Sequence, residues 1–319
     1  MKSKKLDIKN LVNDEKYMRR ALVLGEKGRG KTSPNPMVGA IVVKSGRVVG
    51  AGYHRKPGSE HAEIIALKKA GRRACGADLY VTLEPCNTQG RTPPCAPRIA
   101  AAGIKRVVVA TADSNKINRN NGIKWLRQKG IKVTVGVLEQ ESLKMNEDYN
   151  KFMRTGIPFV TVKAAMSLDG KIAAPNGSSK WISGKKSRQF VARLRRQVDA
   201  VLVGRRTFLI DKPRLKGVKN KVFLGKNKVK LKNLLRKLGE KGIMHVLIEG
   251  GGETIASALE EKLVDRIYVF IAPKIIGGKR SPTLVDGKGV SDIAKAVRIK
   301  NTSVEKVGND FLIKGCLQE

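Results

Sequence analysis

The sequence predicts two α/β domains that meet near residue 153. The chain has 319 residues, which exceeds the usual size of a single domain. Short β-rich runs alternate with helical patterns in both halves, with turn residues between them. A glycine followed closely by a proline in "RTGIP" (Arg154 to Pro158) interrupts this alternation, as expected at a boundary. We therefore expect one domain over residues 1–153 and a second over residues 154–319.

The first half contains a predicted β-hairpin followed by a helix. "MVGAIVV" (Met37 to Val43) and "RVVGAGYH" (Arg47 to His54) flank a Lys-Ser-Gly turn. "HAEIIALKKAG" (His61 to Gly71) predicts a helix that ends at a glycine cap. Further strands are expected at Leu79–Leu83, Arg106–Thr111 and Lys132–Leu138, with helices near Ala96–Ala102 and Gly122–Lys129. This order predicts a layered α/β domain with a largely parallel sheet.

The second half begins again with a strand after a helical run from Glu139 to Met153. Its predicted strands are Phe159–Met166, Asp199–Gly204, Met244–Gly252 and Asp265–Pro273. Helical segments lie between these strands, so this half is also expected to be an α/β domain. We find no sequence repeat that relates the two halves.

The chain is strongly basic, with 65 Lys and Arg against 27 Asp and Glu and a formal net charge of +38. Such a charge suggests a polyanionic partner. However, the lysines are spread along the whole chain, and only 4% of the residues are aromatic, which leaves few platforms for base stacking. We interpret the charge as a solvated, lysine-rich surface. Nucleic-acid binding and the steering of phosphorylated substrates are the alternatives.

The sequence predicts neither a membrane span nor export. It has no run of eighteen apolar residues, and its first residues lack the apolar stretch of a signal peptide. The four cysteines, Cys75, Cys86, Cys95 and Cys316, are too few and too unevenly spaced to crosslink a chain of this length. We expect a reducing, cytoplasmic compartment, in which thiolates are free to bind metal.

One histidine and two cysteines provide the ligand count of a catalytic zinc site. Such a site uses three protein ligands and keeps a fourth position for water. His61, Cys86 and Cys95 meet this count. Cys86 follows a proline after a predicted strand, and Cys95 stands where a helix should begin. Both thiols are therefore expected near helix N-termini, where the thiolate is favoured.

Glu63 is the expected proton carrier beside this site. Residues i and i+2 of a regular helix do not share a face, so Glu63 and His61 converge only if His61 lies in the first, loosely wound turn. Zinc lowers the pKa of bound water from 15.7 to roughly 7, and a carboxylate can pass the proton to a departing amine. This is the logic of zinc-dependent base deaminases, although eight residues separate the cysteines here instead of two. A structural zinc, with Cys75 or His54 as a fourth ligand, is the alternative.

Longer stretches resemble one enzyme family in both halves. "TSPNPMVGAIVVKSGRVVGAGYH", "HAE" and "TLEPCNTQGRTPPC" are similar to the deaminase half of the bifunctional riboflavin-biosynthesis deaminase-reductases. "RTGIPFVTVKAAMSLDGKIA", "SKWISG", "DAVLVGRRTFLIDKPRL" and "LIEGGGETIASALEEKLVDRIYVFIAPKIIGG" are similar to the reductase half, in the same order. The resemblance runs from Tyr17 to Phe311. It implies a cytidine-deaminase-like three-layer domain followed by a dihydrofolate-reductase-like domain.

The resemblance implies two consecutive reactions on a phosphoribosyl pyrimidine. The first is zinc-assisted hydrolytic deamination of 2,5-diamino-6-(5-phosphoribosylamino)pyrimidin-4-one. The second is NADPH-dependent reduction of the ribosyl side chain to ribityl. The implied cofactors are one Zn²⁺ in the first domain and NADPH in the second. A small-molecule substrate and a homo-oligomer are expected, with neither a nucleic-acid nor a membrane partner.

The resemblance also implies roles for individual residues. His61, Cys86 and Cys95 match the zinc ligands, and Glu63 matches the catalytic residue. The implied substrate contacts are Asn35, Lys163, Ser179, Arg195, Leu215 and Glu249. The implied cofactor contacts are Ala165, Trp181, Thr207, Asp211, Gly251, Gly252, Glu253, Thr254, Ile255, Ala256 and Ser257. On physical grounds, "GGGETIAS" is a glycine turn opening a helix whose free N–H groups can hold phosphate, or simply a tight strand-to-helix turn.

The sequence departs from the family pattern at several positions. Thr88 and Gln89 stand where the family has histidines, so a substrate contact there is lost or is replaced by a hydroxyl and an amide. Val218 replaces an arginine, with Lys216 and Lys219 as flanking cations, and "DKP" (Asp211 to Pro213) replaces "DDP". The interval between about 216 and 230 is shortened. Two alternatives follow: a deaminase with a structural reductase domain, or a zinc deaminase that acts on nucleic acid.

Overall fold

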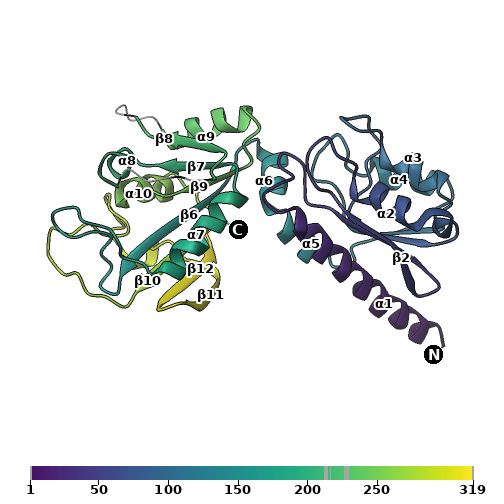
Figure 1. Ribbon diagram of the computed structural model, residues 1–319, viewed down its shortest axis with the longest axis horizontal. Coiled ribbons are helices and arrows are strands. Elements are labelled where there is room, and N and C mark those ends of the chain that lie inside the picture. Colours follow the sequence, from purple (N-terminus) through teal and green to yellow (C-terminus); the bar gives the residue numbers. More distant parts are fainter. Residues whose placement is uncertain (1, 212–214, 216, 226–229, 318–319) are drawn as a thin grey trace. The chain divides into compact units, whose positions relative to one another are not determined.

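The structure of the chain is a computed structural model that describes every residue except 1, 212–214, 216, 226–229 and 318–319 (Figure 1). The chain divides into two compact units, residues 1–155 and residues 156–319. The division falls two residues after the boundary predicted from the sequence.

Unit 1 is built on a five-stranded sheet in the order β2-β1-β3-β4-β5. Its strands are β1 (Gly39–Lys44), β2 (Arg47–Tyr53), β3 (Asp78–Leu83), β4 (Arg106–Thr111) and β5 (Lys132–Val135). The predicted hairpin is present as β1 and β2. However, β1 pairs antiparallel with both β2 and β3, whereas β3, β4 and β5 run parallel. Because β1 is antiparallel to both of its neighbours, β2, β3, β4 and β5 all run in the same direction. The sheet is therefore largely parallel, as predicted, and β1 is its one antiparallel strand.

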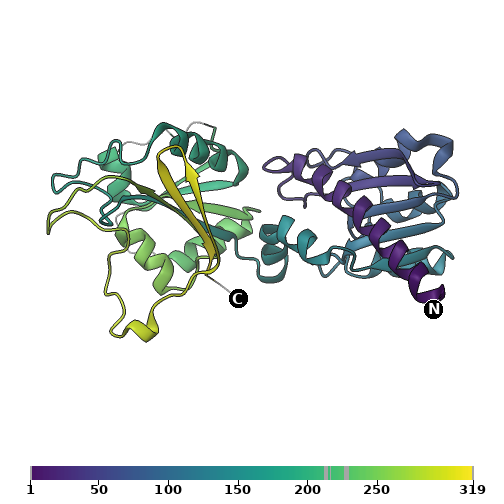
Figure 2. The ribbon, with the colours of Figure 1, turned by 90° about the horizontal axis from the view of Figure 1, so that it is seen from below.

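Helices cover both faces of this sheet, so unit 1 has three layers (Figures 1 and 2). Along β3, Leu79 and Val81 pack on one face with residues of α2, α3 and α4, whereas Tyr80 points to the other face, toward α1. The helices of this unit are α1 (Lys2–Gly25), α2 (Ala62–Ala70), α3 (Cys95–Ala101), α4 (Asn121–Gln128), α5 (Glu139–Met145) and α6 (Glu147–Thr155), with 3₁₀ turns η1 (Glu26–Gly28) and η2 (Gly71–Ala74).

Two helical features of unit 1 differ from the sequence prediction. Helix α1 was not predicted, and its long polar sequence gives no clear apolar stripe, although Met18 and Ala21 are fully buried against the sheet. The single helix expected from Glu139 to Met153 is two helices. Asn146 separates them with backbone angles of φ −113° and ψ 31°, and its side chain bonds both backbone groups of Met37.

Unit 2 is built on a seven-stranded sheet in the order β11-β12-β10-β6-β9-β7-β8. Its strands are β6 (Phe159–Ser167), β7 (Ala200–Val203), β8 (Asn220–Phe223), β9 (His245–Ile248), β10 (Arg266–Ala272), β11 (Lys300–Val307) and β12 (Asp310–Cys316). The five strands from β10 to β8 are parallel, and the C-terminal hairpin adds two antiparallel strands at one edge. The sequence did not predict this hairpin.

The apolar faces of the unit 2 sheet are covered by different helices. Leu235 of α9 and Ile255 of α10 belong to the larger core, and Leu194 of α7 belongs to a separate core on the other face. The helices are α7 (Lys185–Gln197), α8 (Arg205–Asp211), α9 (Leu231–Glu240) and α10 (Gly252–Glu260), with a 3₁₀ turn η3 (Ile293–Lys295). Among all described helices of the chain, none has the length and apolar character to cross a membrane.

Candidate functional site

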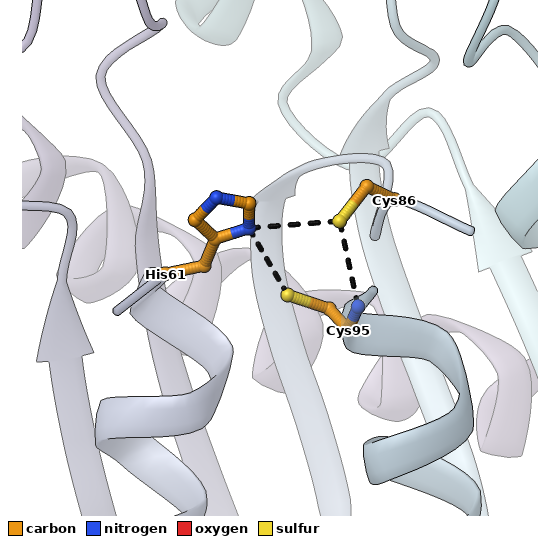
Figure 3. A group of neighbouring side chains, drawn as sticks. All are labelled: His61, Cys86 and Cys95. Carbon is orange, nitrogen blue, oxygen red and sulfur yellow. Dashed lines mark hydrogen bonds between the residues drawn. The ribbon is translucent and has the colours of Figure 1, made fainter. Parts of the chain in front are cut away.

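Three short segments of unit 1 bring His61, Cys86 and Cys95 together (Figure 3). His61 is the N-cap of α2, with extended backbone angles of φ −72° and ψ 161°. Cys86 lies in the loop that follows β3, and Cys95 is the first residue of α3. Because His61 precedes the helix, its ring turns away from the helical face and toward the two thiols. This is the local geometry that convergence with Glu63 requires.

The distances within this cluster fit a zinc ion. The three possible ligand atoms lie within 4.8 Å of one another. His61 Nδ1 is 3.2 Å from Cys95 Sγ and 3.6 Å from Cys86 Sγ. Tetrahedral zinc with ordinary bond lengths places nitrogen and sulfur ligands about 3.6 Å apart. The donor set of one imidazole and two thiols therefore fits zinc in both chemistry and spacing, and it leaves a fourth position for a non-protein ligand.

The electrostatics of the cluster favour a thiolate. The pKa of Cys86 is lowered to about 4, first by the hydrogen bond from the Cys95 thiol and also by His61, while burial acts in the opposite direction. The same hydrogen bond and burial raise the pKa of Cys95. The hydrogen bond to Cys86 raises the pKa of His61. The lowered pKa favours the thiolate form of Cys86, whereas Cys95 keeps its proton more strongly, so metal binding must release the Cys95 proton.

Glu63 lies in the first turn of α2 with only 3% of its surface exposed. Its carboxyl group interacts with the Cys95 thiol, which places it beside the cluster. Burial raises the pKa of Glu63, and the charge of Cys86 adds to this, whereas His61 acts to lower it. A raised pKa makes this buried carboxylate a better proton acceptor than an exposed one, as a group that accepts and returns a proton requires.

Asn35 is held beside the cluster by a histidine that the sequence analysis treated only as an alternative ligand. The Asn35 side-chain nitrogen lies 3.0 Å from His54 Nε2, and His54 Nδ1 lies 3.3 Å from the Glu60 carbonyl oxygen. The His54 and His61 rings meet edge to face, with centroids 5.4 Å apart. Burial lowers the pKa of His54. A neutral His54 that donates to Glu60 accepts from Asn35 and so fixes the amide.

The loop that carries Cys86 is supported by Glu84, which the sequence analysis missed. Its buried carboxylate accepts four backbone N–H bonds, from Asp113, Asn120, Gly122 and Ile123, at 2.9–3.2 Å. These donors belong to the loop after β4 and the start of α4. Glu84 therefore connects the end of β3 to a segment that is distant in the sequence. The four N–H donors lie 29–39 positions after Glu84, so no local sequence pattern indicates this role.

The two residues that replace family histidines bond within the protein. Thr88 donates to Asn118 Oδ1 at 2.6 Å, and Asn118 in turn donates to the buried Asp113 at 3.0 Å. Gln89 donates weakly to the Gly90 carbonyl oxygen at 3.3 Å. The hydrogen of the Thr88 hydroxyl is thus used to join two loops.

Unit 2 carries two cavities that share Ile172, Ser179, Thr207 and Gly251. The larger has a volume of about 780 Å³ and the smaller about 720 Å³. The smaller is lined by several of the predicted residues: Lys163, Ala165, Ser179, Trp181, Arg195, Thr207, Glu249 and Gly251. The larger is lined by Ser179, Thr207, Gly251, Gly252, Glu253, Thr254 and Ser257. The structure therefore gathers most predicted substrate residues in one cavity and most of the glycine-rich segment in the other.

The smaller cavity contains a largely buried ion pair. Arg195 of α7 donates from Nε and Nη2 to the two carboxylate oxygens of Glu249, each at 2.6 Å. Burial alone would raise the pKa of Glu249, but hydrogen bonds from Arg195 and the charge of Lys163 outweigh it, so this pKa is lowered. Trp181, 63% exposed, lies at the same cavity with the Arg188 guanidinium 4.4 Å from its ring centroid. Cations and an aromatic face are therefore available to an anionic, ring-containing ligand.

The larger cavity fits a dinucleotide in size and in chemistry. Its volume lies in the range of roughly 300–1,000 Å³ typical of cofactor sites. Helix α10 begins in its wall after Gly251, and the first N–H groups of a helix attract phosphate. A Cβ at Gly204 would lie 2.4 Å from Thr254 Oγ1, so close backbone approach at this wall depends on glycine. The glycine turn is thus a tight turn that places the start of a helix in the cavity wall.

Several predicted residues do not reach either cavity. Leu215 is buried in the core with Leu194 and Leu247, and Ile255 and Ala256 are buried on the inner face of α10. Lys219, expected as a cation that flanks Val218, is ion-paired with Asp199 at 3.5 Å and lines neither cavity. The residues 212–214 and 216 lie outside the described part of the chain, as does the side chain of Asp211.

Comparison with known families supports both units. The profile "Cytidine and deoxycytidylate deaminase zinc-binding region" matches residues 11–111, and the profile "RibD C-terminal domain" matches residues 158–222 and 214–313. These matches confirm the predicted fold class. The second profile matches in two pieces that meet at 214–222, where the sequence analysis found a shortened interval.

Individual relatives match over nearly the whole chain. The riboflavin biosynthesis protein RibD of Aquifex aeolicus is 42% identical, covering 94% of this chain and 97% of the relative. Its alignment runs over 352 positions, more than the 319 residues of this chain, so the relative has residues that this chain lacks. A structure of Acinetobacter baumannii RibD matches with a TM-score of 0.90 at 32% identity, covering 97% of this chain and 100% of that chain. The diaminohydroxyphosphoribosylaminopyrimidine deaminase/5-amino-6-(5-phosphoribosylamino)uracil reductase of Thermotoga maritima matches with a TM-score of 0.89 at 34% identity, with the same coverage.

Proposed function

The chain belongs to the RibD family of bifunctional riboflavin-biosynthesis deaminases and reductases, and from this premise we propose how its residues divide the two reactions. Unit 1 is the zinc-binding deaminase domain, and unit 2 is the reductase domain with a nucleotide cofactor. The proposed substrates are those named for the Thermotoga relative, a diaminopyrimidine carrying a phosphoribosylamino group and then its deaminated uracil product.

In the deaminase reaction, His61, Cys86 and Cys95 hold the zinc ion and Glu63 moves the proton. Bound zinc supplies a water molecule activated for attack near neutral pH. Glu63 takes a proton at its carboxylate and returns it to the departing amine, which leaves as ammonia. Asn35, whose amide nitrogen is bonded to His54, directs its side-chain oxygen to the pyrimidine. The observation that carries this proposal is the close cluster of three ligand atoms with a buried carboxyl group beside it.

In the reductase reaction, the smaller cavity binds the deaminated substrate and the larger cavity binds the dinucleotide. Lys163 and the Arg195–Glu249 pair line the substrate side, and the N–H groups at the start of α10 would hold the phosphates of the cofactor. The four residues shared by the cavities mark where nicotinamide and sugar meet. We propose NADPH as the hydride donor, in line with the family resemblance. No ligand contact is proposed for Leu215, Ile255 and Ala256, because these side chains are buried in the core.

Three further expectations stay predictions. A cytoplasmic location is supported by four free cysteines, two of which are needed as thiolates. A homo-oligomer is expected from the resemblance, and light scattering during size-exclusion chromatography measures it. A nucleic-acid partner is not expected, and weak RNA retention that disappears with added salt would agree with a nonspecific lysine-rich surface.

Substitution of Glu63 by Gln tests the deaminase proposal. The amide cannot carry the proton, so we expect ammonia release from the diaminopyrimidine substrate to fall by about 100- to 10,000-fold. The three zinc ligands are unchanged, so bound zinc measured by atomic absorption should stay near one per chain.

The matched control is Glu60→Gln, which changes an exposed carboxylate three residues earlier that is paired with Lys68 at 2.5 Å. This control should retain normal ammonia release. Full turnover by the Glu63 variant would contradict the assigned proton carrier. Absence of zinc from the wild-type protein would contradict the metal site itself.

A further inference from the structure

One short segment contacts both nitrogens of the His61 ring. On one side, Cys95 Sγ lies 3.2 Å from Nδ1. On the other side, Thr92 Oγ1 lies 3.1 Å from Nε2. Thr92 is half-buried and stands three residues before Cys95 in "TPPC". The same stretch therefore provides a proposed zinc ligand and a hydroxyl on the far nitrogen of another proposed ligand.

The backbone between these two contacts is stiff. Pro93 and Pro94 fix their own φ angles, and Pro94 precedes the first residue of α3. The Cys95 and Ala96 N–H groups both donate to the Cys86 carbonyl oxygen at 3.0 Å. At the other end of the segment, the Thr92 carbonyl oxygen accepts from the Gly90 N–H at 3.3 Å. The position of the Thr92 hydroxyl relative to the cluster is thus set by covalent and backbone constraints.

The contact has a chemical consequence for the metal site. A neutral imidazole has one protonated nitrogen and one with a free lone pair. If Nδ1 faces the metal, Nε2 carries the hydrogen and requires an acceptor, since an unsatisfied buried donor is costly. We propose that Thr92 is a positioning residue that accepts the Nε2–H of His61 and so fixes the tautomer and ring orientation needed for zinc binding. This inference rests on the proposed role of His61 as a zinc ligand.

The same loop contains an internal comparison. Thr88 lies four residues before Thr92, but its hydroxyl donates to Asn118 and not to a proposed zinc ligand. A general contribution of threonine hydroxyls to loop stability would affect both positions alike. A positioning role affects only Thr92. Loss of an outer partner of a metal-bound histidine typically weakens metal affinity by about 10- to 100-fold.

The experiment compares Thr92→Val, Thr92→Ser and Thr88→Val in the full chain. Zinc affinity is measured by competition with a chromophoric chelator. We expect Thr92→Val, which keeps the shape and removes the hydroxyl, to bind zinc about 10- to 100-fold more weakly. Thr92→Ser keeps the hydroxyl and should recover most of the affinity, and Thr88→Val should bind as the wild type does.

A second measurement follows the His61 ring directly. In the zinc-loaded, ¹⁵N-labelled protein, the Nε2–H signal of His61 should be protected from solvent exchange in the wild type and in Thr92→Ser, and lost in Thr92→Val. Equal zinc affinity and equal protection in Thr92→Val and the wild type would overturn the inference while leaving the zinc site in place. Failure of the wild-type protein to bind zinc would overturn both this inference and the proposed deaminase site.

Discussion

Glu249 shows how one residue can be both buried and charged. Its two carboxylate oxygens accept a forked pair of bonds from Arg195, and Lys163 adds a second positive charge. These interactions lower its pKa below the ordinary value of 4.5 despite burial. A group with a lowered folded-state pKa contributes stability above its unfolded-state pKa, and this contribution is lost as the pH falls through the folded-state value. The pair therefore stabilises unit 2 at neutral pH and not in strong acid.

Substitution of Arg195 by Met tests this linkage. The variant leaves the Glu249 charge buried without its main partner, so the free energy of unfolding at pH 7.5 should fall by about 3–5 kcal/mol. Burial then raises the pKa of Glu249, and a raised pKa favours the folded state below it. The difference from the wild type should therefore shrink at pH 4. Urea unfolding followed by circular dichroism at the two pH values measures it.

The control for this prediction is Arg196→Met, which removes the exposed neighbouring guanidinium of α7. It should change the free energy of unfolding by less than about 0.5 kcal/mol. The double variant Arg195→Met with Glu249→Gln should be more stable than Arg195→Met alone at pH 7.5, because the uncompensated charge is gone. Equal instability at both pH values would contradict the electrostatic explanation.

The residues of the metal cluster were predictable because their identity carries their chemistry. Imidazole and thiol groups are the usual zinc ligands, so His61, Cys86 and Cys95 stand out in a chain with three histidines and four cysteines. Thr92 and Glu84 were missed because hydroxyl and carboxylate groups are common, and their roles exist only once distant segments meet. Leu215 shows the converse: family resemblance suggested a ligand contact, but the structure buries its side chain in the core.

At the scale of elements, helix α4 and the Cys86 loop are joined by close backbone contact. A Cβ built on Gly122 would lie only 1.7 Å from the Pro85 carbonyl oxygen. The obstacle is backbone, which cannot rotate away as a side chain can. Glu84 draws the two segments together by accepting the Gly122 N–H at 3.0 Å. The position of Cys86 thus depends on the absence of a side chain at residue 122.

Substitution of Gly122 by Ala should separate these elements. We expect the added methyl group to reduce the free energy of unfolding by about 1–3 kcal/mol and to displace Cys86 enough to weaken zinc binding. Thermal melting and chelator competition measure the two effects. The control is Gly90→Ala in the neighbouring loop, where a Cβ meets no atom within 4 Å. An unchanged zinc affinity in the Gly122 variant would show that the close contact does not position Cys86.

Elements with strong local signals were predicted well, and those that depend on tertiary contacts were not. Helix α2 ends directly before Gly71, which is the predicted glycine cap. Gly71 adopts a positive φ of 55°, a backbone conformation that favours glycine. Strand β11, by contrast, is almost wholly exposed and lacks the apolar alternation that identifies a strand. It forms because β12 supplies its hydrogen-bonding partner. Pairing of this kind cannot be read from the strand's own residues.

For the whole molecule, each proposed site is complete within one unit. The metal cluster uses residues 61–95, and the described residues that line the two cavities fall between 163 and 286. The shortened interval affects only unit 2, where β8 still pairs with β7 at the sheet edge and Phe223 lines the larger cavity. We expect the reductase unit to retain its catalytic activity.

If the two sites act independently, a variant that lacks one activity should be complemented by a variant that lacks the other. When the wild-type protein is given the deaminated substrate and NADPH, the absorbance of the reduced nicotinamide should decrease. Glu63→Gln should give the same decrease but release no ammonia from the diaminopyrimidine. Lys163→Met, which removes a cation from the smaller cavity, should release ammonia and consume little NADPH.

A mixture of the two variants should carry the diaminopyrimidine through both steps, because the deaminated intermediate can leave one protein and bind another. If the wild type consumes no NADPH, the shortened unit is structural and the chain acts as a deaminase alone. If only the mixture fails, the intermediate passes between sites without release.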